Sequence, residues 1–290
     1  MIIDSHVHLD PAENPAEKMV QTMDAGGVDK AVVFAPACEN LPAMPQGLLA
    51  LGRTLLQTPL SGLARGLYED ATRSQPGKLK TGGKFYSIHT YPDNRPVAQA
   101  LKQYPDRFIG LVFLNPKGNP GVMAELEQGI GEFGMRGVKV HSWFHNYDPS
   151  RWLVDVADRC QAAGLPILIH MGSRPETGDV QGLLDQFPNL KLILAHLGIP
   201  WFARSWQQAR QYPNVYLDIS GPYLSPGLIA RAAREVGPAK LIYGTDGPYG
   251  LRAPDGTLSY AHSKAWVEGL PITPEEKEGI FGGNLLRLLG

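Results

Sequence analysis

Two histidines stand two positions apart near the start of the chain, in the run IIDSHVH of residues 2–8. Alternate side chains of an extended strand point to the same face, so His6 and His8 would project together from the end of an apolar strand. Two such imidazoles can provide half of the ligands of a metal site. Taken alone, the pair is more readily explained as two hydrogen-bonded histidines in or near a core.

Later apolar runs end in the same manner, with a residue that can bind a metal or transfer a proton. Imidazole and carboxylate groups are typical ligands of zinc and of other divalent cations. The repeated placement therefore favours a shared site over a set of unrelated buried polar residues. The residues concerned are His170, His196 and Asp246.

The spacing of these runs indicates the architecture. Short β-branched or leucine-rich runs alternate with helix-like stretches, which is typical of βα units around a parallel sheet. An open doubly wound sheet would spread its strand ends along a line, whereas a closed barrel brings them to one face. We therefore predict an α/β fold, a (β/α)8 TIM barrel formed by a single domain over residues 1–290. The predicted strands are 2–8, 29–35, 107–114, 136–141, 165–170, 190–196, 214–219 and 240–245.

Several motifs together resemble the amidohydrolase superfamily, and the resemblance spans nearly the full chain. More narrowly, the chain is similar to the amidohydrolase-related branch that includes aminocarboxymuconate semialdehyde decarboxylase. The ending IFGGNLLRLL of residues 280–289 is also similar to that branch. The other motifs are IDSHVH at 3–8, GVKVH at 137–141, IH at 169–170, LAHLG at 194–198 and YGTDGP at 243–248.

The resemblance implies a metal centre held by His6, His8, His170 and Asp246. Zinc is the expected ion, with one ion favoured and two as the alternative. Asp246 would also accept or donate a proton in the reaction, and His196 would act as a catalytic group beside it. Alternatively, His196 binds a second metal or only orients another ligand.

Lys139 decides between the one-metal and two-metal interpretations. In some members of the superfamily a lysine on the fourth strand is carboxylated and bridges two metals. Lys139 stands two residues before His141, so both would face the same side of that strand. The alternative role for Lys139 is an ion-paired structural amine below the site.

Residues at the expected mouth of the barrel suggest the class of substrate. His141 and Arg174 are candidates for substrate binding, and Trp143, His145 and Arg252 also follow strand ends. Arginine can bind a carboxylate through two parallel hydrogen bonds, so we expect a small carboxylate-bearing substrate.

Residues 37–92 form an insertion after the second strand that is much longer than an ordinary βα loop of about 2–6 residues. Leucines recur at helical spacing on both sides of Pro59, which predicts two short amphipathic helices. Such an insertion begins on the catalytic face and could be a lid, with His89 or Arg95 reaching the substrate. We favour packing on the barrel or in a homodimer over direct catalysis.

Composition excludes several classes of partner. The 290 residues are 43% hydrophobic and 19% charged, as in ordinary soluble chains. A net charge of −1 gives no basic footprint for nucleic acid or for an anionic membrane. No apolar run approaches the ~18 residues of a membrane span. Two cysteines give no disulfide framework, so we expect a cytoplasmic protein.

These features lead to a main functional hypothesis and three alternatives. The main one is a metal-dependent hydrolase of a small organic acid, which uses metal-activated water on an amide, lactone or related C–O or C–N bond. The first alternative is a zinc-dependent decarboxylase of an aromatic or unsaturated carboxylic acid. The others are a DNase-type phosphoesterase, disfavoured by the balanced charge and by Lys139, and a non-catalytic metal-binding barrel.

Overall fold

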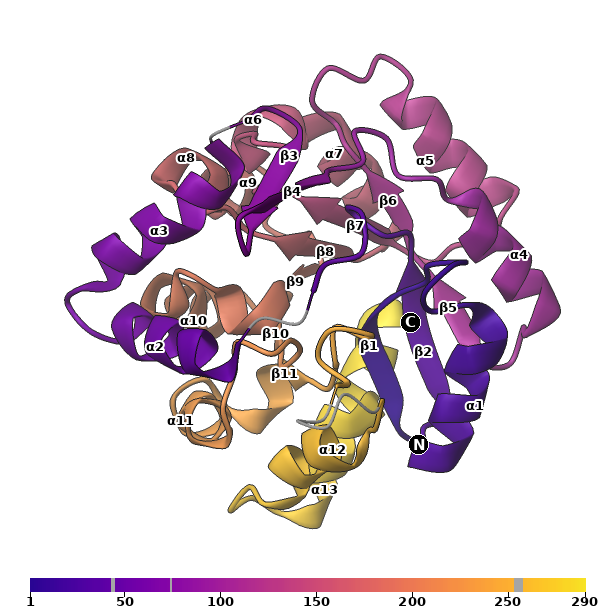
Figure 1. Ribbon diagram of the computed structural model, residues 1–290. Helices are drawn as coiled ribbons and strands as arrows, with labels where there is room; N and C mark the ends of the chain where they lie inside the picture. The colour runs from indigo at the N-terminus through magenta and orange to yellow at the C-terminus, as the bar shows by residue number, and fades with distance from the viewer. Residues whose placement is uncertain (43–44, 74, 253–257) are drawn as a thin grey trace.

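Parallel strands alternate with helices throughout most of the chain, and the strands line the centre of the molecule (Figure 1). The structure is a computed structural model that describes residues 1–42, 45–73, 75–252 and 258–290. Each parallel strand is short and almost fully buried, because helices cover its outer side and side chains fill the interior. The strands of the barrel are β1 (Ile3–His8), β2 (Lys30–Phe34), β5 (Phe108–Gly110), β6 (Val112–Leu114), β7 (Val138–His141), β8 (Ile167–His170), β9 (Leu192–Leu194), β10 (Val215–Asp218) and β11 (Leu241–Ile242).

The strands pair in chain order. β1, β2 and β5 form one parallel group, and β6 to β11 form a second in the order of the sequence. β5 and β6 are one run interrupted at Leu111, whose backbone N–H donates to the carbonyl of Val33. The predicted strand 107–114 therefore joins the two groups, pairing with β2 through its first half and with β7 through its second.

Backbone hydrogen bonds also join the last strand to the first. The N–H of Ser5 donates to the carbonyl of Tyr243 over 2.9 Å, and that of Asp246 donates to the carbonyl of His6 over 2.8 Å. The N–H of His8 also donates to the carbonyl of Gly247 over 2.8 Å. These bonds link the segment after β11 to β1, so the predicted (β/α)8 barrel is confirmed and each of the eight predicted strands has its counterpart.

Local signals in the sequence set the ends of the outer helices. The Asp148 carboxylate accepts from the N–H of Ser150 at the start of α6, and Gly164 ends α7 in the left-handed conformation. Ser225 caps α11 in the same way as Asp148 caps α6. The helices outside the insertion are α1 (Ala16–Gly26), α4 (Arg95–Gln103), α5 (Val122–Gly131), α6 (Pro149–Trp152), α7 (Val154–Ala163), α8 (Pro175–Gly178), α9 (Gln181–Gln186), η1 (Ala195–Gly198), α10 (Phe202–Gln211), α11 (Pro226–Val236), η2 (Pro238–Lys240), α12 (Ala261–Glu268), α13 (Pro274–Glu278), η3 (Gly279–Gly283) and α14 (Asn284–Leu289).

Close packing between helices and strands fixes the position of the strand ends. Gly129 of α5 lies so near β6 that a Cβ atom there would be 2.2 Å from Cγ2 of Val112. Only glycine permits this approach without a shift of the helix. Leu168 and Ile169 of β8 are among the many fully buried aliphatic residues that form the core. Burial of each such side chain contributes about 1.5–3 kcal/mol.

The insertion contains the two predicted helices on either side of Pro59, and also a hairpin that we did not predict. α2 (Gln46–Leu56) and α3 (Ser61–Arg73) lie beside α10 and α11 (Figure 1), and β3 (Lys78–Thr81) pairs antiparallel with β4 (Lys84–Ser87). The guanidinium of Arg53 donates to the carbonyl of Leu224 over 2.7 Å. The insertion is thus held against the loop that follows β10.

The leucine stripe of the insertion is only partly used in packing. Leu49 is buried, whereas five others are more than half exposed, between 56% and 65%. Packing on the barrel therefore accounts for only part of the stripe. The exposed members are Leu48, Leu51, Leu60, Leu63 and Leu67. Among the residues that the structure describes, no helix has both the length and the hydropathy needed to cross a membrane.

Candidate active site

His6 is fixed in one orientation by a buried carboxylate. Its Nδ1 atom lies 2.8 Å from Oδ2 of Asp218, the last residue of β10. An Nδ1–H that donates to a carboxylate leaves the Nε2 lone pair facing the other way. That Nε2 atom lies 3.4 Å from Oδ1 of Asp246 and 3.2 Å from Nζ of Lys139.

His8 approaches the same carboxylate from its own position on β1. Its Nε2 atom lies 3.3 Å from Oδ1 of Asp246, and its Nδ1 atom lies 3.4 Å from the carbonyl of Ala35. Both histidines therefore direct Nε2 toward Asp246, as the two-residue spacing predicts. The pair and the aspartate come from opposite ends of the chain and meet where β1 and β11 are neighbours.

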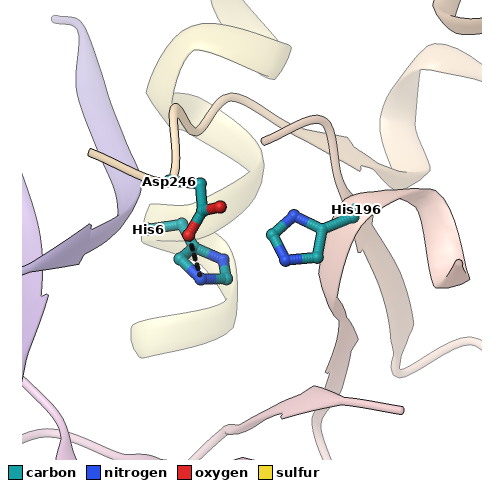
Figure 2. Close-up of side chains that lie close together, drawn as sticks. All are labelled: His6, His196 and Asp246. Atoms are coloured by element: carbon teal, nitrogen blue, oxygen red, sulfur yellow. Dashed lines mark ion pairs between the residues drawn. The ribbon is translucent and has the colours of Figure 1, made fainter. Parts of the chain in front are cut away.

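His196 and Asp246 both have a backbone conformation that non-glycine residues seldom adopt. Their φ angles are +55° and +62°. Such residues cluster at functional sites, where the surrounding structure holds them in place. Metal-binding atoms of His6, His196 and Asp246 all lie within 4.8 Å of one another (Figure 2), and all three residues are buried.

A chain of hydrogen bonds runs through His170 and His196. The Nδ1 atom of His196 lies 3.0 Å from the carbonyl of Ser220, so this nitrogen donates and Nε2 is the acceptor. Nε2 of His196 in turn lies 3.1 Å from Nδ1 of His170. The remaining nitrogen of His170, Nε2, lies 3.2 Å from the hydroxyl of Tyr68. The insertion therefore contacts the site directly through Tyr68 of α3.

Electrostatics favour neutral imidazoles beside an ionised carboxylate. Burial, assisted by Lys139, lowers the pKa of His6 to about 3. Burial also lowers the pKa values of His141 and His170 well below the usual range. Burial alone would raise the pKa of Asp246, but His196, His6 and His8 outweigh it and lower that pKa. Neutral imidazole and ionised carboxylate are the forms that bind metal ions.

Lys139 is fully buried below the site. Burial lowers the pKa of its amine to about 8, against the opposing influence of Asp218 and Asp246. Its Nζ also lies 4.8 Å from the ring centre of Phe34. The buried amine therefore lies beside an imidazole and an aromatic ring and in the field of two carboxylates.

The two predicted substrate-binding residues, His141 and Arg174, have different partners in the structure. The ring of His141 stacks on that of His170, with centroids 4.0 Å apart and planes inclined by 12°. Arg174 pairs with Glu69 of the insertion over 3.5 Å, and it also donates to the side chain of Asn146. His141 is therefore part of the site, whereas the guanidinium of Arg174 is paired with protein groups.

The two residues expected to reach the substrate, His89 in the insertion and Arg95 in the following helix, make other contacts. Arg95 pairs with Asp93 over 2.7 Å and leaves 78% of its side chain exposed. The backbone carbonyl of His89 lies 3.0 Å from Nε2 of His145. The prediction for Arg95 is wrong because an adjacent carboxylate holds its guanidinium at the surface.

Sequence reasoning missed several residues of the site. Asp218 follows the predicted strand pattern, since it ends β10 as His170 ends β8, and this phase could have identified it. Tyr68, Tyr223 and Tyr249 carry no comparable signal. The ring of Tyr249 lies 5.8 Å from that of His8, and the ring of Tyr223 lies 5.6 Å from that of His196.

The donor set suits a divalent metal ion. The imidazoles of His6 and His196 and the carboxylate of Asp246 converge in a buried region, so the structure groups the predicted catalytic His196 with two predicted ligands. Asp218 holds the imidazole of His6 from behind. Carboxylate-oriented histidines are a regular feature of metal sites in proteins. The residues present therefore fit the kind of ion that the sequence motifs imply.

A comparison with protein families identifies the chain. The family model described as amidohydrolase matches residues 3–290. The chain belongs to the amidohydrolase family. An amidohydrolase assignment agrees with the motifs, with the barrel and with the metal-binding donor set, and it makes the protein an enzyme of a metal-dependent family.

Relatives of this amidohydrolase include a decarboxylase. Gamma-resorcylate decarboxylase of Polaromonas sp. (strain JS666 / ATCC BAA-500) is 24% identical over 250 residues, which cover 66% of this chain and 73% of that protein. The barrel itself is similar to an uncharacterised TIM-barrel protein from Bordetella bronchiseptica, with a TM-score of 0.66, 19% identity and coverage of 99% and 98% of the two chains.

Other solved proteins with the same fold are named for different reactions. The dihydroxybenzoic acid decarboxylase of Polaromonas sp. JS666, solved with manganese and 2-nitroresorcinol, has a TM-score of 0.63 and 18% identity, covering 99% of this chain and 96% of its own. The 4-oxalomesaconate hydratase of Rhodopseudomonas palustris has a TM-score of 0.62 and 17% identity, covering 100% and 95%. At these identities the likeness concerns the fold.

Proposed function

We propose that this amidohydrolase is a metal-dependent decarboxylase of a small aromatic carboxylic acid. The observation that carries the proposal is the likeness to gamma-resorcylate decarboxylase over 250 residues. Our main expectation from the sequence was hydrolysis, with decarboxylation as the alternative. The same Asp246 and His196 can serve either reaction, so the relatives give the decarboxylase the advantage.

Aromatic side chains around the metal-binding residues suit a flat substrate. Trp143 and Phe144 follow β7, and their ring centroids lie 4.9 Å apart. Tyr223 faces His196, and Tyr249 faces His8. Aromatic rings pack favourably against one another with centroids about 4.5–7 Å apart, so such a lining favours an aromatic acid over a short aliphatic one.

The metal would be held by His6, His8, His170 and Asp246. When bound there, a divalent cation supplies Lewis-acid polarisation of a substrate oxygen. The imidazole-rich donor set suits zinc, and the related Polaromonas decarboxylase was solved with manganese. We propose one ion per chain, because the Lys139 amine is fully buried beside the ring of Phe34 and in the field of Asp218 and Asp246.

Asp246 and His196 would supply the proton that replaces the lost carboxyl group. Asp246 takes up a proton from solvent through His196 and delivers it from Oδ to the ring carbon that bears the carboxylate. The bond from that carbon to the carboxylate then breaks, its electron pair returns to the ring, and carbon dioxide leaves. One proton is consumed for each molecule of carbon dioxide released.

A substrate panel tests this proposal. Protein loaded separately with zinc and with manganese should release carbon dioxide from hydroxylated benzoic acids, and chelation should abolish the release. Lactones and amides of the same acids provide the matched comparison. Turnover of the lactones or amides without release of carbon dioxide from the free acids would reject the decarboxylase in favour of the hydrolase.

A further inference from the structure

We propose that the insertion supplies a specificity-determining residue, Tyr68, whose hydroxyl, together with Tyr223 and the indole of Trp143, recognises a ring hydroxyl oxygen of the substrate. The inference rests on the proposed function, because it takes the substrate to be an aromatic acid. It assigns the insertion a part in substrate selection in addition to its packing on the barrel.

The ring of Tyr68 is held by a stack of aromatic side chains. It lies against Trp143 with centroids 3.8 Å apart and planes inclined by 15°. The plane of Trp143 is inclined by 20° to that of His170, and His170 stacks on His141. Rings from the insertion, from the loop after β7 and from the strand ends are thus nearly parallel. Packing on both elements fixes the direction of the Tyr68 hydroxyl.

The hydroxyl of Tyr68 lies at the reactive side of the site. It is 3.2 Å from Nε2 of His170, one of the proposed metal ligands. It is also hydrogen-bonded to Tyr223, whose ring lies 5.6 Å from that of His196. The two phenols therefore stand next to both the proposed metal centre and the catalytic histidine. A substrate oxygen beside His170 would meet them.

Trp143 provides an independent reason to expect an oxygen acceptor here. Its indole nitrogen is buried and has no hydrogen-bond partner among the described residues. A buried donor without a partner is costly, at about 1–3 kcal/mol, and indole can only donate. A hydroxyl oxygen on the substrate ring would satisfy this donor. The ring stacked on Trp143 is that of Tyr68, so both polar groups belong to one aromatic stack.

The guanidinium that we expected to bind the substrate is paired elsewhere, and the insertion takes part in this as well. Glu69, the neighbour of Tyr68 in α3, pairs with Arg174 over 3.5 Å. The same short segment thus places a neutral phenol at the site and gives the nearby arginine a carboxylate partner. A neutral hydrogen-bonding group favours a substrate ring that carries a hydroxyl over one that does not. It attracts a negatively charged substrate less than a free guanidinium would.

Binding measurements on the metal-loaded full chain test the role of Tyr68. Isothermal titration calorimetry would compare 2,6-dihydroxybenzoate with benzoate as probes. Tyr68→Phe keeps the stacked ring and removes the hydroxyl. It should weaken binding of 2,6-dihydroxybenzoate about 3–10-fold, the range for one neutral hydrogen bond, and change binding of benzoate less than 2-fold. Tyr91→Phe, at a 54% exposed tyrosine, is the matched control and should change neither.

Several outcomes would overturn the proposal. Equal weakening of both probes by Tyr68→Phe would show a structural role only, and unchanged binding of both would show no role. Failure of the wild type to prefer 2,6-dihydroxybenzoate would also contradict it. The proposed function is tested separately, by release of carbon dioxide. If the wild type releases none, the proposed function fails, but Tyr68→Phe could still abolish the preference for the hydroxylated probe.

Discussion

The Nδ1 atom of His6 lies 2.8 Å from Oδ2 of Asp218, although 211 residues separate the two in the chain. The other carboxylate oxygen of Asp218 accepts from the backbone N–H of His196 over 2.8 Å. A single buried carboxylate thus positions one proposed metal ligand and one proposed catalytic residue. Burial would raise the pKa of Asp218, but the adjacent His6 outweighs it and keeps that pKa low.

Asp218→Asn should weaken metal binding by about 10–100-fold, because an amide holds the Nδ1–H of His6 less strongly and leaves Nε2 less basic. Calorimetric titration with zinc would measure the change. Asp179→Asn is the matched control, since Asp179 pairs with Arg204 on the surface. An Asp218→Asn protein with wild-type zinc affinity and a native circular dichroism spectrum would contradict the orienting role.

Asp246→Asn should lower kcat by about 10²–10⁴-fold, the usual contribution of a proton-transferring group. The fold should persist, because the backbone N–H of Asp246 still donates to His6. Steady-state release of carbon dioxide measures the effect, and thermal unfolding checks the fold. Retention of wild-type kcat would remove Asp246 from the proton-transfer step.

Lys139→Met tests the number of metal ions. We expect one ion per chain in the wild type and one in the variant, because Lys139 acts as a buried amine held by its neighbours. Inductively coupled plasma mass spectrometry on purified, zinc-loaded protein counts the ions. Two ions in the wild type and one or none in the variant would instead indicate a bridging, carboxylated lysine.

His145 should make the protein less stable in acid. Burial lowers its pKa to about 4 from the ordinary value of 6.5. Between these values the unfolded chain binds a proton that the folded protein does not, so this contribution is lost as pH falls from about 6.5 to 4. The full loss is about 3 kcal/mol.

Urea unfolding at pH 7 and at pH 4.5 measures this dependence. The free energy of unfolding of His145→Gln should fall less on acidification than that of the wild type, because glutamine takes up no proton. Other buried histidines contribute equally in both proteins and cancel in the difference. Identical falls in the two proteins would exclude His145 as a source of acid sensitivity.

The barrel could be predicted because its signal is local. Each strand is a short apolar run, and a residue such as His170 or Asp246 at its end gives the phase of the unit. The two insertion helices were predictable for the same reason, from the spacing of leucines. The β3–β4 hairpin was not, since its strands are four residues each and only partly buried.

Contacts between distant segments lay beyond the sequence pattern. Tyr68 reaches His170 only because the insertion folds back onto the barrel, and no periodicity indicates which tyrosine does so. Arg174 stands at a suitable strand end, yet Glu69 of the insertion pairs with it. Local spacing thus indicates which residues stand at strand ends, whereas their partners depend on how the insertion packs on the barrel.

Incorporation of solvent hydrogen and oxygen into the products tests the central claim most directly. Metal-loaded protein would be incubated with 2,6-dihydroxybenzoate in D₂O and, separately, in H₂¹⁸O, and the products analysed by mass spectrometry and NMR. We predict one deuterium at the ring carbon that carried the carboxylate, and no ¹⁸O in the aromatic product. Absence of this deuterium, together with ¹⁸O-labelled acid formed from an ester or amide of the same compound, would contradict decarboxylation and support hydrolysis.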